Sequence, residues 1–351
     1  MNPRNTALAA IAGAVFTLAT AHAQSGRDQI SIVGSSTVYP FATVVAERFG
    51  QTTGFKTPKI ESTGSGGGMK LFCNGLGVEH ADVTNSSRRM KASEYATCHK
   101  NGVTDIVEVL IGYDGIALAN AVSSDQVEIT LKDLYLALAK KIPNPDGSET
   151  FIENPYNNWS EINAELPDAT IEVLGPPPTS GTRDAFAELA LEGGCNAFDW
   201  VKALSKSDKD LYKEVCHTVR EDGRFIEAGE NDNLIVQKLE ANPNALGIFG
   251  FSFLDQNSDI VQPSWIDGTE PTFESISDGS YPVSRPLYFY VKKAHIGVIP
   301  GIKEYLDEFT SEGTWGEEGY LADKGMIPLN EDERMATAAD VSNLKNMPEL
   351  K

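Results

Sequence analysis

Four short loops rich in serine, threonine and glycine carry the side chains of this sequence that are best suited to hold a ligand. Hydroxyl groups donate hydrogen bonds, and glycine lets a ligand approach the backbone closely. Each loop precedes a segment with helical periodicity, where unpaired N–H groups and the positive end of the helix dipole face the loop. Serine and threonine are also ordinary N-caps, so a single loop of this kind is not a site. The set of four predicts an oxyanion site. The loops are 34–37, 62–68, 85–87 and 179–182.

Histidine and serine side chains that could support catalysis do not occur in the sequence patterns of known catalytic sites. The histidines at 80, 99, 217 and 295 are far apart, and the sequence contains no His-Glu-x-x-His pair. Ser65 lacks the first glycine of a nucleophile elbow, and the segment 64–70 lacks the Gly-Lys-Ser/Thr ending of a nucleotide-binding loop. We therefore expect no catalytic residue, no metal and no cofactor, and a binding protein rather than an enzyme.

The net negative charge of the chain argues against two classes of binding partner, nucleic acids and anionic membranes. The 351 residues include 50 acidic and 29 basic side chains, which gives a formal net charge of −21. Such a chain is repelled by nucleic-acid phosphates and by anionic membrane surfaces. The length predicts two domains.

The first 23 residues read as a secretory signal peptide. Arg4 provides a basic start, 7–20 is an apolar run of small residues, and Ala21-His22-Ala23 is a cleavage signal. No cysteine follows the cleavage point, so a lipid anchor is not expected. The sequence therefore predicts a soluble, exported protein.

Export fits the cysteine content. Four cysteines fall into two local pairs, and three pairings are formally possible. We expect the bonds Cys73–Cys98 and Cys195–Cys216, each of which closes a loop of twenty-odd residues. Zinc ligation would require a close Cys-x-x-Cys pair, which the sequence lacks, whereas free buried cysteines remain an alternative.

The elements that must position the four loops form a repeated α/β pattern. Short β-branched runs at 29–33, 59–61, 82–83 and 171–174 predict strands, and each is followed by one of the loops and then by a helix. Two longer apolar runs that contain glycine, 107–119 and 244–251, predict crossovers between two domains.

The loop sequences resemble those of a known family in order and in type. Gly34-Ser35-Ser36-Thr37-Val38, the loop 62–69 and Thr179-Ser180-Gly181-Thr182 resemble periplasmic phosphate-binding proteins of the phosphate ABC importer, the PstS family. The segments 159–167, 300–305 and 319–329 are similar to that family as well. The resemblance covers essentially all of the mature chain and is greatest to the branch that includes the SphX-type proteins of cyanobacteria.

The resemblance implies a fold and a division into domains. The fold is that of a type II periplasmic binding protein, a Venus flytrap with two α/β lobes joined by two crossover strands and a ligand between them. The signal peptide is 1–23. The expected lobe I is discontinuous, 24–112 and 250–351, and the expected lobe II is 113–249.

The resemblance also implies ligand contacts. Thr37, with its neighbour Ser36 and the N–H of Val38, would hold one side of the anion, and Ser65 would donate from the second loop. Two ionic positions of the family differ here: its aspartate falls at Ser87 and its arginine at Pro176. We expect an arginine, Arg88 ahead of Arg183, to replace the missing one, with Asp114 a weaker candidate for the acceptor of the phosphate proton. The donors expected from the opposite lobe are Ser180, Gly181 and Thr182.

The function that follows from this reading is high-affinity binding of inorganic phosphate in the periplasm. The protein would be a monomer that delivers phosphate to an ABC importer permease in the membrane. Another tetrahedral oxyanion, such as sulfate, arsenate or a phosphonate, is the main alternative. An exported phosphatase and a surface scaffold are more distant ones.

Overall fold

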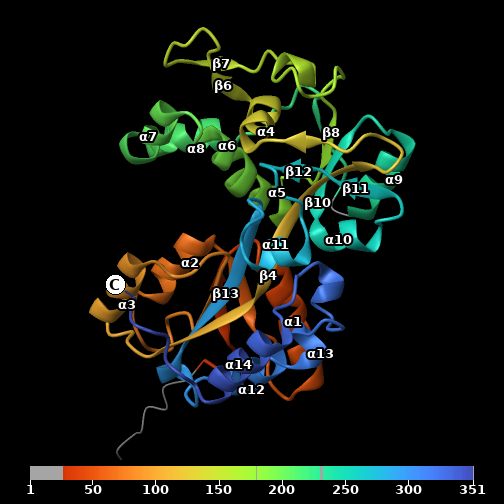
Figure 1. Ribbon diagram of the computed structural model, residues 1–351. Coiled ribbons are helices and arrows are strands. Elements are labelled where there is room, and N and C mark those ends of the chain that lie inside the picture. The colour runs from red at the N-terminus through yellow and green to blue at the C-terminus, as the bar shows by residue number, and fades with distance from the viewer. Residues whose placement is uncertain (1–26, 179, 230–231, 351) are drawn as a thin grey trace, which may run out of the picture.

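Two α/β lobes make up the structure, a computed structural model that describes residues 27–178, 180–229 and 232–350 (Figure 1). The expected signal peptide, 1–23, lies outside the described residues. None of the helices in these ranges is long and apolar enough to cross a membrane. The predicted alternation of strands, loops and helices is confirmed.

Lobe I is built on a sheet whose first strands are parallel. β1 (Ser31–Gly34) lies between β2 (Lys59–Ser62) and β3 (Val83–Ser86). Because parallel strands end at the same edge of a sheet, the loops that follow them open on one side. β13 (Ser284–Lys292) completes this part of the sheet by pairing antiparallel with β3.

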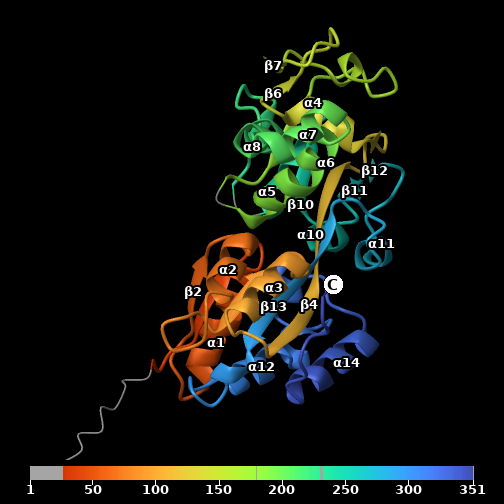
Figure 2. The same ribbon diagram turned by 90° about the vertical axis from the view of Figure 1, so that its left-hand side faces the viewer.

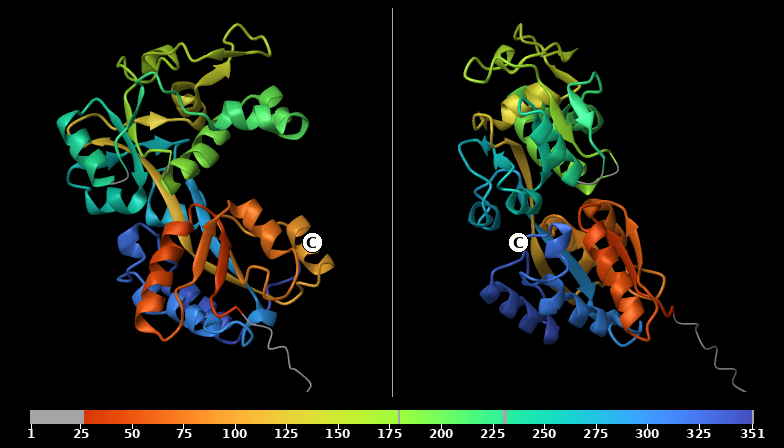
Figure 3. Two further views of the ribbon diagram at one scale, coloured as in Figure 1. Left: turned by 180° about the vertical axis from the view of Figure 1, so that it is seen from behind. Right: turned by 90° about the vertical axis from the view of Figure 1, so that its right-hand side faces the viewer.

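A long strand, β4 (Ile106–Ala121), connects the two lobes. Its first part, 106–115, pairs along the length of β13. Its last part, 116–121, pairs instead with β10 (Leu246–Gly250) and with β11 (Val261–Pro263) of lobe II. One strand thus belongs to both halves of the sheet, as expected for the run 107–119. β4 and β13 run side by side from one lobe to the other (Figure 3).

The chain returns to lobe I later than the sequence indicates. The run 244–251, expected to be the second crossover, forms β10, which pairs with β4 and with β8 (Val173–Gly175) inside lobe II. Residues 251–283 then pack on lobe II, and the return strand is β13. The expected boundary at residue 250 therefore falls inside lobe II. The error arose because a buried strand and a crossover are both apolar runs with glycine.

Helices cover both faces of the lobe I sheet (Figure 1). Alternate residues of β13 show this division: Leu287 and Phe289 pack into one core, whereas Tyr290 packs into the other. The first core is covered by α1 (Tyr39–Thr52), α12 (Ile302–Phe309), α13 (Glu312–Trp315) and α14 (Glu331–Ser342), and the second by α2 (Ser65–Phe72) and α3 (Ala92–Lys100).

In lobe II, alternate residues of the last part of β4 also face two different cores. Ile116 and Leu118 face one core, and Ala117 and Ala119 face the other. The larger core receives residues from α4 (Leu131–Leu138), α5 (Gly181–Phe186), the π-helical turn η2 (Ala187–Leu191), α6 (Glu192–Cys195), α7 (Asp199–Ser207), α8 (Lys209–His217) and α11 (Phe273–Ser277). The smaller is covered by α9 (Asp232–Ala241) and α10 (Phe251–Gln256).

The remaining short elements complete the chain. β9 (Phe225–Glu227) extends the sheet beyond β8, and the pairs β5 (Glu128–Ile129) with β12 (Trp265–Ile266) and β6 (Lys141–Pro143) with β7 (Phe151–Glu153) form two small sheets. Three 3-10 turns are η1 (Trp159–Glu161), η3 (Lys293–His295) and η4 (Ala322–Lys324) in the described ranges.

The glycine run 66–68, expected in a loop, forms the first turns of α2. A Cβ on Gly68 would lie 2.4 Å from Cα of Gly34 and 2.6 Å from Oγ1 of Thr84. Glycine at 68 thus allows the helix to pack directly on β1 and β3. The helix begins at Ser65, so this hydroxyl lies three residues after the end of β2.

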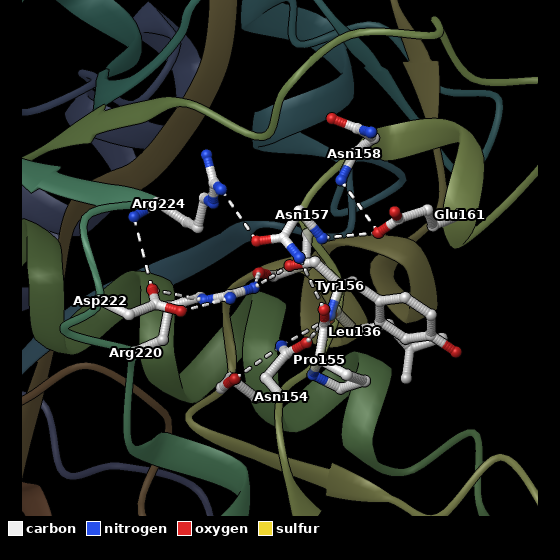
Figure 4. A network of polar contacts seen from close by, with 12 residues as sticks. Leu136, Asn154, Pro155, Tyr156, Asn157, Asn158, Glu161, Arg220, Asp222 and Arg224 are labelled. Atoms are coloured by element: carbon white, nitrogen blue, oxygen red, sulfur yellow. Dashed lines mark hydrogen bonds and ion pairs between the residues drawn. The ribbon is translucent and has the colours of Figure 1, made fainter.

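A buried arginine fixes the segment that leads to the fourth loop (Figure 4). Arg220 is 3% exposed, donates to the carbonyl O of Tyr156 at 2.9 Å and pairs with Asp222. Beside it, Nδ2 of Asn154 donates to the carbonyl O of Leu136 at 2.7 Å. These bonds hold 154–157 against the end of α4. The carbonyl O of Asn157 in turn accepts a hydrogen bond from the N–H of Ile171, just before β8.

Candidate anion site

The first three predicted loops lie at the ends of β1, β2 and β3 in lobe I. The described part of the fourth, 180–182, follows β8 in lobe II, with α5 facing the lobe I helices (Figure 2), and Thr179 lies outside the described residues. Two of the loops touch across the lobes. A Cβ on Gly181 would lie 3.3 Å from the carbonyl O of Ser36 and 3.4 Å from Cα of Thr37. Glycine at 181 therefore lets the start of α5 approach the first loop closely.

The first loop presents two buried hydroxyls, those of Ser35 and Thr37, just before α1. Thr37 is 5% exposed, and its Oγ1 accepts a short hydrogen bond from Nη2 of Arg285. The N–H of Val38, expected to face the ligand, donates to Oγ of Ser35 at 3.3 Å. Because that bond is long, it is a weak competitor for a charged acceptor.

The second and third loops are joined by their serines. Oγ of Ser65 lies 3.1 Å from Oγ of Ser87 and accepts from the N–H of Ser87 at 3.1 Å. The two predicted residues are thus adjacent at the start of α2. The pair places neutral hydroxyls at the position where the resemblance implies a carboxylate.

The fourth loop caps its own helix. Oγ of Ser180 accepts from the N–H of Thr182 at 3.2 Å, which is the usual N-cap arrangement. Between them, Gly181 reaches the first loop from lobe II. The structure thus brings the first and fourth loops into contact and the second and third loops into contact.

Arg88 is held by a carboxylate of its own lobe. Its Nη1 and Nη2 donate to the two carboxylate oxygens of Glu94 at 2.9 and 2.7 Å. The pKa of Arg88 is raised, mainly by this pairing. The guanidinium still lies near the site, since a Cβ on Gly66 in the first turn of α2 would be 3.9 Å from Nη2. Both of its Nη groups, however, are engaged by one carboxylate of lobe I.

Arg183 points back into lobe II. Its Nη1 donates to the carbonyl O of Pro176 at 3.1 Å, and its guanidinium lies 4.2 Å from the centre of the Phe225 ring. Burial lowers the pKa of Arg183, while nearby carboxylates including Glu227 raise it. The side chain therefore stabilises the end of β8 and is turned toward β9.

A third arginine, which sequence reasoning missed, lies beside the first loop. Arg285 on β13 is 7% exposed and stands opposite Asp114 of β4 in the strand register. Besides Thr37, its guanidinium donates to Oδ2 of Asp114 at 3.3 Å and to Oε2 of Glu188 at 2.6 Å. The sequence signal was a single arginine directly before the apolar run 286–291.

Burial dominates the electrostatics of Asp114. The side chain is buried, and this desolvation raises its pKa. Arg285 opposes that effect, and the negative charge of Glu188 adds to it. Asp114 is thus a partner that holds Arg285 in place from the strand side.

Both disulfides expected from the cysteine spacing are confirmed: Cys73 bonds to Cys98 in lobe I and Cys195 to Cys216 in lobe II. Neither bond crosses between the lobes. In the described ranges, no group of three or more His, Cys, Asp or Glu side chains is placed to hold a metal ion.

Known proteins are similar to this chain over most of its length. The family model described as "PBP superfamily domain" matches residues 19–313. Protein SphX of Synechococcus elongatus is 28% identical over 300 residues, which is 82% of this chain and 76% of that protein. The phosphate-binding protein PstS of Staphylococcus saprophyticus is 27% identical over 290 residues, 80% of this chain and 75% of that one.

Solved structures show the same fold. A possible phosphate-binding protein from Planctomyces limnophilus superposes with a TM-score of 0.72 at 25% identity and covers 92% of this chain and 100% of its own. PstS from Borrelia burgdorferi superposes with a TM-score of 0.55 at 18% identity, covering 86% of this chain and 99% of its own. The two-lobed type II periplasmic binding protein fold is therefore confirmed.

Proposed function

The chain belongs to the PBP superfamily, and we propose that it is an extracytoplasmic receptor that binds inorganic phosphate and delivers it to an ABC importer. The observation that carries this proposal is the meeting of hydroxyl loops from both lobes beside a buried arginine. Relatives named as phosphate-binding proteins and as SphX support the choice of phosphate.

The donors of the site suit a tetrahedral anion. Hydroxyls and backbone N–H groups of both lobes converge, and hydrogen bonds to a charged acceptor are about twice as strong as neutral ones. Arg285 supplies a guanidinium beside the first loop. Its bond to the neutral hydroxyl of Thr37 is the one that a phosphate oxygen would replace, because this exchange breaks no ion pair. Arg88 and Arg183 are held by other partners. The proposed contacts are Ser36, Thr37, Val38, Ser65, Ser87, Ser180, Gly181, Thr182 and Arg285.

On this proposal the protein works outside the cytoplasm as a monomer. Rotation of the lobes about β4 and β13 encloses the anion, and the closed form is the one that a membrane permease recognises. The site binds and releases its ligand unchanged, so the protein performs no chemistry.

The test is calorimetric titration with phosphate, sulfate and a phosphonate after any bound ligand has been stripped by unfolding, dialysis and refolding. We expect tight binding of phosphate. Absence of heat with phosphate, or tighter binding of another anion, would contradict the proposal. Hydrolysis of a chromogenic phosphate ester, measured with and without chelator, separates binding from a phosphatase activity, and we expect none.

A further inference from the structure

Glu188 is a carboxylate from lobe II that faces the charged groups of the site. It lies in the π-helical turn η2, two turns after the start of α5, and its side chain is 53% exposed. Its Oε2 accepts from Nη1 of Arg285 at 2.6 Å. This ion pair joins lobe II to a crossover strand.

The charge of Glu188 reaches beyond that pair. It contributes to the raised pKa of Asp114, after burial, and to the raised pKa of Arg88, after the pairing with Glu94. Asp114 lies on β4 and Arg88 follows β3, so the carboxylate acts on groups of a crossover strand and of lobe I as well. Because Arg285 donates to both Glu188 and Thr37, this carboxylate is also linked directly to the first hydroxyl loop.

Two facts make this carboxylate important for selectivity. Ser87, which stands where the resemblance implies an acidic residue, is a neutral hydroxyl bonded to Ser65. Phosphate keeps at least one proton at neutral pH, whereas sulfate keeps none. A carboxylate can accept a hydrogen bond from a protonated anion but repels a fully deprotonated one.

We propose that Glu188 is the specificity-determining residue that rejects fully deprotonated oxyanions such as sulfate. The inference rests on the proposed function. Glu188 offsets the charge of Arg285 from the solvent side, while Asp114 holds the same guanidinium from the strand side. Glu188 is half exposed and Asp114 is buried, so Glu188 is the carboxylate that an entering anion meets.

The test compares Glu188→Gln with Glu188→Asp and with a matched control. Glu192→Gln makes the same change four residues later, where Oε2 of Glu192 contacts Nε2 of His217 at 2.5 Å, away from Arg285. Dissociation constants for phosphate and sulfate are measured by calorimetry at neutral pH. Circular dichroism melting verifies that each variant is folded.

We expect the phosphate-to-sulfate affinity ratio to fall at least tenfold in Glu188→Gln, because sulfate gains affinity. Glu188→Asp should recover most of the ratio, and Glu192→Gln should keep it. An unchanged ratio in folded Glu188→Gln, while the wild-type protein binds phosphate, overturns this inference and leaves the proposed function standing. A wild-type protein that binds no phosphate overturns the proposed function, and with it this inference.

Discussion

Strand β13 carries a buried cation at each of its ends, and the two differ in the number and type of their hydrogen-bond acceptors. Arg285, at the end next to the anion site, has three side-chain acceptors, two of them carboxylates. Lys292, at the far end, is fully buried and donates to the carbonyl O of Gly75 at 2.6 Å, with its Nζ 5.1 Å from the centre of the Phe72 ring.

The difference shows that this fold provides charged partners for the buried cation beside the site and few for the distant one. Burial lowers the pKa of Lys292 to about 8, although Asp82 acts in the opposite direction. Burying a charge is costly unless it is paired and hydrogen-bonded. Arg285 meets that condition with partners from both lobes, and Lys292 meets it only in part. The cation beside the site is therefore fixed by partners on both sides, whereas burial lowers the pKa of the distant one.

The largest expected effect comes from Arg285. Replacement by alanine removes the proposed cationic contact and leaves Asp114 buried without its partner, which costs about 3–5 kcal/mol of stability. We expect phosphate affinity to fall roughly 100-fold or more, since a charged hydrogen bond is worth about 1.5–3 kcal/mol and more than one is lost. Calorimetry measures the affinity, and chemical denaturation measures the stability.

Arg285→Lys is the companion variant in case the alanine protein does not fold. A lysine keeps the charge but has no planar fork, so it can satisfy fewer of the three acceptors. We expect an affinity between those of the wild-type and alanine proteins. Full affinity in the lysine variant would show that the charge alone, and not the arrangement of donors, supports binding.

Lys292 should make stability depend on alkaline pH. The unfolded chain keeps this proton up to the ordinary pKa of 10.5, whereas the folded protein releases it at about 8. Between these values the unfolded state binds more protons, so the free energy of unfolding rises with pH, by up to about 3 kcal/mol. Below pH 8 the cost of burying the charge is fully present.

The measurement is the difference in unfolding free energy between wild type and Lys292→Met at pH 7.5 and pH 10. Taking the difference cancels the titration of buried tyrosines, which occurs in both proteins. We expect the wild-type protein to gain on the variant as pH rises. A constant difference across this range would mean that Lys292 is better compensated than its contacts indicate.

The hydroxyl donors should have smaller effects than Arg285. Ser65→Ala and Thr182→Ala each remove one donor to a charged acceptor, worth about 1.5–3 kcal/mol, or about a 10- to 150-fold loss of phosphate affinity. Both side chains are only partly buried, so stability should change little. Titration of each variant decides the matter, and unchanged affinity in both would place the anion elsewhere.

The local parts of the site could be predicted from the sequence, whereas the ionic part could not. Hydroxyl loops between strands and helices have a local signature, and so do cysteines spaced 25 and 21 residues apart. The role of Arg285 could not be predicted because its partners are distant in sequence. The pairing of β13 with β4 and the approach of the two lobes bring them together: Thr37, Asp114 and Glu188.

The prediction that the glycine run after β2 forms a loop was wrong for a related reason. Three successive glycines are usual in loops, and only the packing of Gly68 against Gly34 shows that a helix has to begin there. Likewise, the run 244–251 looks like a crossover until the pairing of β10 with β8 places it within lobe II. Contacts distant in sequence decided each of these cases.

The smallest expected effect is that of Arg88, which the sequence favoured as the cationic contact. Both carboxylate oxygens of Glu94 already accept from its guanidinium, and Glu94 also accepts from the N–H of Lys91 at 2.8 Å, so the carboxylate is fixed. To bind phosphate, Arg88 would have to give up a bidentate pair, and that loss offsets most of the gain. We therefore expect Arg88→Ala to change phosphate affinity less than about fivefold, or under ~1 kcal/mol. Titration of Arg88→Ala beside Arg285→Lys ranks the two arginines directly: a loss for Arg88 as large as that for Arg285 would mean that Glu94 releases its partner when the lobes close, and that the cation of the site comes from lobe I.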